Sequence, residues 1–221
     1  PLVVIGAHYD SFGSRPGADD NASGVAAMIE LASRLKLRAK ALAFRYQMVA
    51  WTLEEPPMYD TVKMGSYVHA AHLKKTGAKV RLAISLEMLG YYSDQPNSQS
   101  FPIPEMTKLY PTTGNFIALV GRPADRVFAE ALKASFLKTQ LIPTETVLAP
   151  VQMEGIDFSD HRSFWHHGYD ALMITDTSFY RNSNYHKVTD TPDTLDYARM
   201  SAVVRSLDQA LMMLETVPQT K

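Results

Sequence analysis

The sequence predicts an α/β fold in which a mainly parallel central sheet carries helices on both faces. Two observations lead to this prediction. Apolar segments of strand length alternate along the chain with longer segments whose apolar residues recur every three to four positions. The first of the short segments, Leu2 to Ala7, is apolar without interruption, which is typical of a strand that is buried on both faces.

The individual elements follow from the same pattern. Apolar residues from Val25 to Leu35 have helical spacing, and Asn21 or Ser23 is expected to cap that helix. A short helix is expected around Ser163 to Trp165, with Asp160 as its cap. The remaining apolar runs predict strands over 43–51, 80–87, 115–120, 146–148 and 171–175, and helices over 64–75, 124–138 and 195–214.

The connection between the predicted strands 80–87 and 115–120 is unusually long. Residues 89–115 are rich in Pro, Ser, Tyr and Gly, and long connections of this kind are more often functional than idle. The Tyr and Phe residues within 89–110 have two open interpretations, since they either shape a substrate pocket or only pack the loop. Trp51 and Trp165 are expected in the core.

Composition narrows the class of protein. The 221 residues suit a single domain over 1–221, and no internal repeat is visible. With 46% apolar residues and a net charge of −1, neither a disordered chain nor a nucleic-acid-binding surface is expected. No apolar run approaches the roughly 18 residues of a transmembrane helix. The chain opens directly on a core strand at Pro1, so we expect that an upstream N-terminal segment has been lost.

Metal-binding residue types follow the predicted strands. In a parallel sheet the carboxyl ends of the strands share one edge, so side chains that follow them can converge. The chain has no Cys, so any metal must be held by His and carboxylates. The candidates at strand ends or in the loops that follow them are His8, Asp20, Glu54, Glu55, Glu87 and His186.

Two histidines and three carboxylates suffice for two zinc ions if one carboxylate bridges them. Asp20 is the best candidate for the bridge, because it is short and lies on a tight loop. Glu54 and Glu55 are adjacent in an extended segment, so one would bind metal while the other stays free as a proton acceptor. Asp10 points to the same side of the strand as His8 and can hold the second ring nitrogen of this histidine.

Each residue also has a purely structural interpretation. Alone, His8 would be a hydrogen-bonded histidine, and the two Glu would be a solvated loop pair. Asp19 is expected to be a turn or cap residue. His69 and His72 have a possible metal spacing on a helix, but a solvent-facing or partly packed pair is the expected outcome. The ordered placement of the candidates at strand ends favours a joint site.

Five stretches resemble, in order, the motifs of the M28 metallopeptidases, and together they cover nearly the whole chain. They are HYDS, PGADDNASG, LEE, LEMLGY and YHKVTDTPDTLD. The resemblance implies a three-layer α/β/α sandwich with a mainly parallel mixed central sheet. It also implies a co-catalytic zinc aminopeptidase with two Zn²⁺ ions, for which Co²⁺ or Mn²⁺ are possible substitutes.

Carried over to this sequence, the resemblance implies three ligands for each of the two ions. One zinc would be held by His8, Asp20 and Glu87. The other would be held by Asp20, Glu55 and His186. Glu87 stands where better-known members have Asp, and its longer side chain could change the metal spacing.

The same resemblance assigns roles to residues that bind no metal. Glu54 would be the general base, and Tyr185 would help to polarise the scissile carbonyl. Asp10 would orient His8, and Asp190, four residues after His186, would contact the metal ligands without binding metal itself. The loop 56–63 after the Glu pair is longer than we expect for the family.

The predicted reaction is hydrolysis of the N-terminal peptide bond of a peptide with a free N-terminus. The metals would lower the pKa of a bridging water, Glu54 would take its proton, and the resulting hydroxide would attack the carbonyl. The resemblance favours a secreted or periplasmic location, and the oligomeric state is left open. Two alternatives remain, namely a glutaminyl-cyclase-like acyltransferase with one zinc, and a non-catalytic binding module on the same fold.

Overall fold

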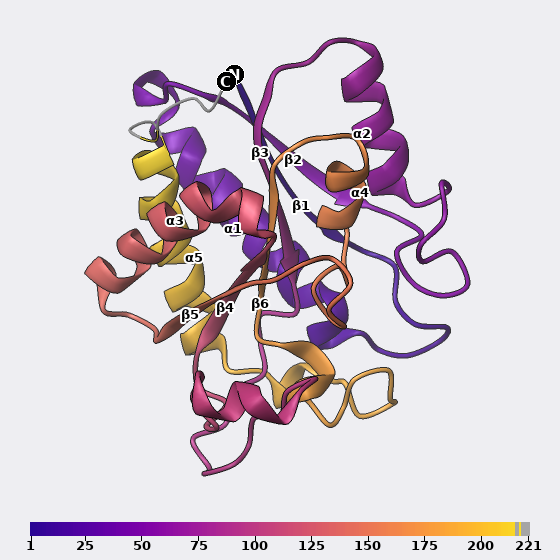
Figure 1. Cartoon of the computed structure of the whole chain (residues 1–221), viewed down its shortest axis with the longest axis vertical. Coiled ribbons are helices and arrows are strands. Elements are labelled where there is room, and N and C mark those ends of the chain that lie inside the picture. The colour runs from indigo at the N-terminus through magenta and orange to yellow at the C-terminus, as the bar shows by residue number, and fades with distance from the viewer. Residues whose placement is uncertain (215–216, 218–221) are drawn as a thin grey trace.

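The computed structural model describes residues 1–214 and 217, and it shows a six-stranded sheet between two layers of helices (Figure 1). The sheet order is β2-β1-β3-β6-β4-β5. All neighbouring strands are parallel except β4 and β6, which are antiparallel. The strands are β1 (Leu2–His8), β2 (Arg45–Trp51), β3 (Val80–Glu87), β4 (Ile117–Gly121), β5 (Thr144–Leu148) and β6 (Ala171–Thr175). The predicted sandwich with a mainly parallel mixed sheet is therefore confirmed.

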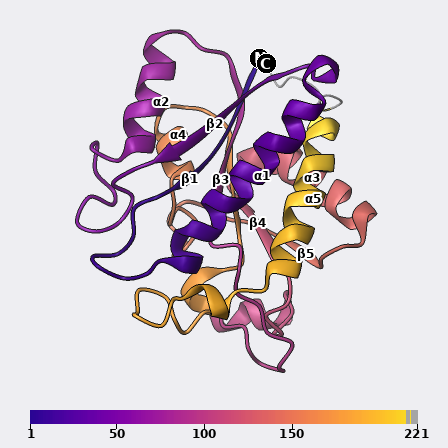
Figure 2. The ribbon, with the colours of Figure 1, turned by 180° about the vertical axis from the view of Figure 1, so that it is seen from behind.

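The two faces of the sheet are covered by different helices. Helices α1, α3 and α5 cover one face, and α2 and α4 cover the other, as the two opposite views show (Figures 1 and 2). The helices are α1 (Gly24–Leu37), α2 (Gly65–Lys75), α3 (Arg126–Thr139), α4 (His161–His166) and α5 (Tyr197–Met213). Within the described residues, no helix is both long and apolar enough to cross a membrane.

Side chains of β1 alternate between the two faces of the sheet and pack against the helices on both. Val3 and Ile5 pack into the cluster formed with α1, α3 and α5, whereas Val4 packs into the second cluster with Trp51 and Phe164. Because side chains of a strand alternate between faces, an uninterrupted apolar run is what a strand needs when both of its faces are covered. Trp51 and Trp165 are both buried, as expected.

The predicted capping residue makes a capping hydrogen bond in α1 but not in α4. Asn21 Oδ1 accepts a hydrogen bond from the backbone N–H of Gly24 at 3.2 Å, as a cap of α1 should. Asp160 precedes α4 with helical backbone angles, and its side chain makes no capping hydrogen bond, so the predicted cap is wrong. The Asp160 carboxylate is instead fully buried, close to the charges of His8, Glu87 and Asp10.

The long connection after β3 forms a loop with closed ends. The backbone N–H of Ser93 donates to the carbonyl oxygen of Gly114 at 2.9 Å, which joins the two ends of the loop. Between them a short 3-10 turn, Pro104–Lys108, lies at the edge of the sheet where the parallel strands end (Figure 1). Compact surface loops with adjoining ends are frequently functional. The end of the predicted domain, at Lys221, lies outside the described residues.

We predict that Gly6→Ala lowers the free energy of unfolding by about 2 kcal/mol, because it overpacks the core. A Cβ atom at Gly6 would lie 2.5 Å from the ring of Trp51 and 2.6 Å from the carbonyl oxygen of Val49. The indole is further held by its hydrogen bond to His69 Nδ1 at 3.2 Å, so it has little room to move. Urea denaturation measures the effect.

The matched control is Gly13→Ala. Gly13 has a φ of +57°, and a Cβ atom there would meet nothing within 4 Å. Its cost is limited to the left-handed backbone strain, about 1 kcal/mol. A Gly6→Ala variant no less stable than Gly13→Ala would contradict the packing argument.

Candidate metal centre

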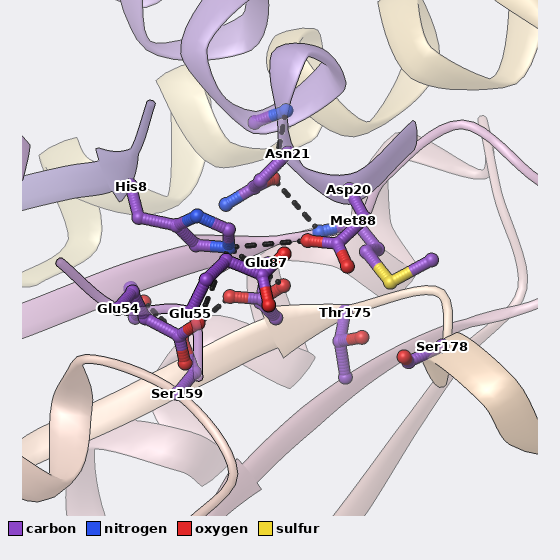
Figure 3. A network of polar contacts seen from close by, with 12 residues as sticks. His8, Asp20, Asn21, Glu54, Glu55, Glu87, Met88, Ser159, Thr175 and Ser178 are labelled. Carbon is purple, nitrogen blue, oxygen red and sulfur yellow. Dashed lines mark hydrogen bonds and ion pairs between the residues drawn. The ribbon is translucent and has the colours of Figure 1, made fainter. Parts of the chain in front are cut away.

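The side chains that follow the strands meet at one edge of the sheet and form two overlapping groups. Figure 3 shows His8, Asp20, Glu55 and Glu87 of these groups, with Glu54 beside them. His8, Asp20 and Glu87 form one group, and Asp20, Glu55 and His186 form the other. In each group the potential ligand atoms all lie within 4.8 Å of one another. Asp20 belongs to both groups, as the position of a bridging ligand requires.

Strand order explains the convergence. Glu55 follows β2, His8 ends β1, Glu87 ends β3 and His186 follows β6, and these four strands are consecutive neighbours in the sheet. The strands are parallel to one another, so their carboxyl ends lie side by side. Asp20 enters from the turn between β1 and α1, above the same edge.

The two carboxylate oxygens of Asp20 face different histidines. Oδ1 lies 3.2 Å from Nε2 of His8, and Oδ2 lies 3.1 Å from Nε2 of His186. Glu87 Oε1 lies 3.4 Å from His8 Nε2, and Glu55 Oε2 lies 3.1 Å from His186 Nε2. The side chains that the sequence groups together therefore lie next to one another in the structure.

Asp10 supports two parts of the site at once. Its carboxylate accepts hydrogen bonds from the backbone N–H groups of Glu54 at 3.3 Å and Glu55 at 3.1 Å. His8 Nδ1 donates to the backbone carbonyl oxygen of Asp10 at 3.0 Å. Since a carbonyl oxygen only accepts, Nδ1 carries the proton, and Nε2 is left to face Asp20 and Glu87.

Asp190 holds the backbone of the predicted bridge rather than a histidine. Its two carboxylate oxygens accept from the backbone N–H groups of Asp19 at 2.9 Å and Asp20 at 3.1 Å. The turn that carries Asp20 is thereby fixed against the segment that carries His186, four residues before Asp190.

Asp19 has a larger role than the turn or cap residue that the sequence predicts. It is fully buried, and its carboxylate accepts from the backbone N–H of Gly90 at 2.8 Å and from Asn182 Nδ2 at 2.7 Å. These contacts join the Asp20 turn to the segments that follow β3 and β6. Burial raises the pKa of Asp19 to about 6. Its position next to Asp20 was the only signal in the sequence.

Ser159 is a further residue that sequence reasoning missed. Its hydroxyl donates to Glu87 Oε2 at 2.7 Å and lies 2.8 Å from the hydroxyl of Ser85. Glu87 thus has one oxygen facing His8 and the other held from behind. The Glu87 side chain, which is longer than that of an Asp, therefore fits here in a fixed orientation. The sequence carries no signal for this contact, which spans 72 residues.

Glu54 stands apart from both groups. Its Oε2 lies 3.8 Å from His8 Nε2, and the side chain is almost completely buried. Burial raises the pKa of Glu54 well above its ordinary value, and the nearby charge of Glu87 adds to this. An unligated carboxyl group with a raised pKa next to a candidate metal site has the properties of a general base.

The site opens into a large apolar pocket. Asp20, Glu54 and Glu87 are among its lining residues. The loop 93–114, strands β4 and β6, and segments 153–158 and 177–180 supply the walls. Its apolar lining includes Phe101, Met106, Tyr110, Phe116, Val120, Ile156, Phe158, Met173 and Phe179. Each of the two interpretations of the long loop therefore holds for some of its aromatic residues: Phe101 and Tyr110 line the pocket, whereas Tyr92 packs against the core. Tyr185 also lines the pocket.

The donor set fits divalent cations. Glu55 Oε1 and His186 Nε2 are buried and have no hydrogen-bond partner. Three carboxylates and two imidazoles converge. Within the described residues, the ion pairs of these carboxylates are with His8 or His186, and none is with a Lys or Arg. Buried charge of this kind is expensive unless it is paired or coordinates a metal. Carboxylate oxygen and imidazole nitrogen are ligands that zinc accepts.

The comparisons with known proteins agree with this geometry. A model of peptidase family M28 matches residues 1–210. Protein YfbL of Escherichia coli (strain K12), which is uncharacterized, is 47% identical over 212 residues, 92% of this chain and 64% of YfbL. Leucine aminopeptidase 1 of Coccidioides posadasii (strain C735) is 26% identical over 211 residues, 90% of this chain and 48% of that protein.

Among solved structures, BSAP, a zinc aminopeptidase from Bacillus subtilis, superimposes with a TM-score of 0.69 at 21% identity. The match covers 100% of this chain and 47% of BSAP. At this level of identity the likeness concerns the fold. The chain spans 64% of YfbL and about half the length of the leucine aminopeptidase and of BSAP.

We predict that the metal-free protein loses stability as the pH rises from 6 to 9. Burial lowers the pKa of His186, but the carboxylates of Asp20 and Glu55 outweigh it and raise this pKa to about 9. Burial raises the pKa of Asp160 to about 7. It also raises the pKa of Glu54 well above the ordinary value of a glutamate. All three groups bind protons more tightly in the folded state than in the unfolded chain, so the free energy of unfolding falls as they deprotonate.

Thermal melting in the presence of a chelator measures this effect. Saturation with Zn²⁺ should abolish the fall, because metal binding replaces the protons and grows stronger as the pH rises. A melting temperature of the metal-free protein that increases between pH 6 and 9 would contradict the assignment of these protons.

Proposed function

The chain belongs to peptidase family M28, and on this premise we propose that it is a zinc-dependent aminopeptidase that removes the N-terminal residue of peptides. The observation that carries the proposal is the placement of Asp20 between His8 and His186, with one carboxylate oxygen toward each. This arrangement supports a pair of metal ions that share a ligand. The names of the leucine aminopeptidase and of BSAP support the same class of reaction.

The residues that would hold zinc are those of the two overlapping groups, His8, Asp20 and Glu87, and Asp20, Glu55 and His186. Two zinc ions bound there would supply Lewis-acid polarisation of the substrate carbonyl and would increase the acidity of water. Asp10 and Ser159 keep the ligands oriented through the hydrogen bonds described above. Residues that orient ligands in this way contribute strongly to metal affinity.

Glu54 would act as the general base. Its carboxylate takes the proton of the attacking water and returns it to the nitrogen of the departing amine, so no net proton change occurs. Its raised pKa favours proton acceptance near neutral pH. The backbone of Glu54 is fixed by the Asp10 carboxylate, which keeps the base in place beside the ligands.

Tyr185 would contact the scissile carbonyl. It lines the pocket together with Asp20, Glu54 and Glu87, so its phenol is on the side from which substrate enters. Burial and the surrounding carboxylates raise the pKa of Tyr185, which keeps the phenol protonated and able to donate a hydrogen bond.

The pocket supports a preference for apolar N-terminal residues. Its walls carry mostly aromatic and aliphatic side chains, and no Lys or Arg is among its described lining residues. An apolar side chain bound there would leave water for an apolar wall, whereas a carboxylate would lose its hydration without a partner. The side chain of the first residue of the peptide is the group that we expect in this pocket.

We predict that Glu54→Gln binds as much zinc as the parent protein and loses at least about 100-fold in kcat, because the amide cannot accept the proton. Elemental analysis and hydrolysis of leucine p-nitroanilide measure the two quantities. Glu55→Gln is the matched control, since it is expected to lose metal as well as activity. Turnover of Glu54→Gln at the parent rate would refute the role of Glu54.

We also predict that kcat/KM for leucine, methionine and phenylalanine p-nitroanilides exceeds that for the aspartate derivative at least about tenfold, since burial of an unpaired carboxylate is costly. The same panel, extended to a peptide with N-terminal Gln, tests the alternative. Cyclisation of that peptide with one zinc per chain, and no anilide hydrolysis, would favour the acyltransferase and overturn the proposed aminopeptidase.

A further inference from the structure

The two candidate histidine ligands are held in different ways. His8 is 1% exposed, and its Nδ1 donates to the Asp10 carbonyl oxygen. His186 is 21% exposed and has a left-handed backbone conformation with a φ of +57°. In the part of the chain that the structure describes, no protein group makes a hydrogen bond with Nδ1 of His186. The hydrogen bond that normally orients a metal-bound imidazole is therefore replaced by another contact.

That contact is a stack of three rings. The ring centroids of Phe12 and His186 are 4.1 Å apart, and the two planes differ by only 2°. The ring centroids of Tyr185 and His186 are 3.7 Å apart, and their planes differ by 19°. Two nearly parallel rings this close to one imidazole would overlap on a single face, so Phe12 and Tyr185 must lie on opposite faces of His186.

We propose that Phe12 is a positioning residue for His186, and that the Phe12–His186–Tyr185 stack holds this imidazole for metal binding. With a ring on each face, the imidazole cannot rotate about its Cβ–Cγ bond without a clash. Its Nε2 stays directed at Asp20 and Glu55, each of which has an oxygen 3.1 Å away. The stack replaces a directional hydrogen bond by steric restriction.

The position of Phe12 in the chain adds a second consequence. Phe12 lies in the loop between His8 and Asp20, so it is tied at both ends to residues of the first group of ligands. His186 belongs to the second group. The stack therefore couples the loop of the first group to the histidine of the second. The inference rests on the proposed function, because it takes His186 to be a metal ligand.

The test separates stacking from simple packing. Phe12→Leu fills a similar volume without a flat face, whereas Phe12→Tyr keeps the aromatic ring. Phe101→Leu is the matched control, because it removes an aromatic ring from the pocket wall at a distance from the ligands. Zn²⁺ affinity is measured by competition with a chelating dye, and Co²⁺ substitution gives an absorption spectrum that reports the coordination geometry.

We expect Phe12→Leu to weaken one of the two zinc-binding steps about tenfold, the effect typical of removing a residue that orients a ligand. The other step, and both steps in Phe12→Tyr and Phe101→Leu, should stay within twofold of the parent protein. Zinc constants of Phe12→Leu equal to those of the parent protein would overturn the proposal. Equal weakening of both steps would overturn it too, because that result indicates a general loss of structure.

A second measurement does not depend on metal. In the metal-free protein, NMR signals of the His186 ring protons should be shifted upfield by the two flanking rings, and Phe12→Leu should reduce this shift while Phe12→Tyr preserves it. An unchanged shift in Phe12→Leu would overturn the stack. Failure of the parent protein to bind two ions, with the ring shifts as expected, would instead refute the proposed function and leave the stacking itself supported.

Discussion

The structure depends on a concentration of buried negative charge at one edge of the sheet. Asp20, Glu54, Glu55 and Glu87 approach one another there, and the carboxylates of Asp19 and Asp160 are buried near them. Such a group is stable only if cations or protons neutralise it, since in the described part of the chain its ion pairs are with histidines and none is with a Lys or Arg. The raised pKa values of Glu54 and Asp160 show the cost of leaving this charge without a cation.

The fold fixes the segments that carry these carboxylates through other carboxylates that accept backbone hydrogen bonds. Asp10 accepts from two consecutive N–H groups after β2, and Asp190 accepts from two consecutive N–H groups in the Asp20 turn. Asp19 joins the turn to two further segments. Neighbouring loops are thus connected through carboxylates that belong to neither candidate ligand group. The candidate ligands keep their positions although they come from residues 8 to 186 of the chain.

Much of this arrangement could be predicted from the sequence. Strands β3 and β6 have the predicted bounds. For β6 the reason is an almost entirely apolar run between Asp170 and Asp176, which marks a buried strand at both ends. The candidate ligands could be found because each follows such a run. The antiparallel pairing of β4 with β6 could not be recognised in the sequence, because the direction of a strand depends on the path of the connections before and after it. The roles of Ser159 and Phe12 also had no signal, because their partners lie 72 and 174 residues away.

The loop from Ser93 to Gly114 has a consequence for how the protein can diversify. Its ends are joined by a backbone hydrogen bond, and it contributes a wall of the pocket but no member of either ligand group. A segment closed at its base can be exchanged as a cassette without disturbing the chemistry next to it. The shape of the pocket can therefore be evolved or engineered here while the candidate ligands are left as they are.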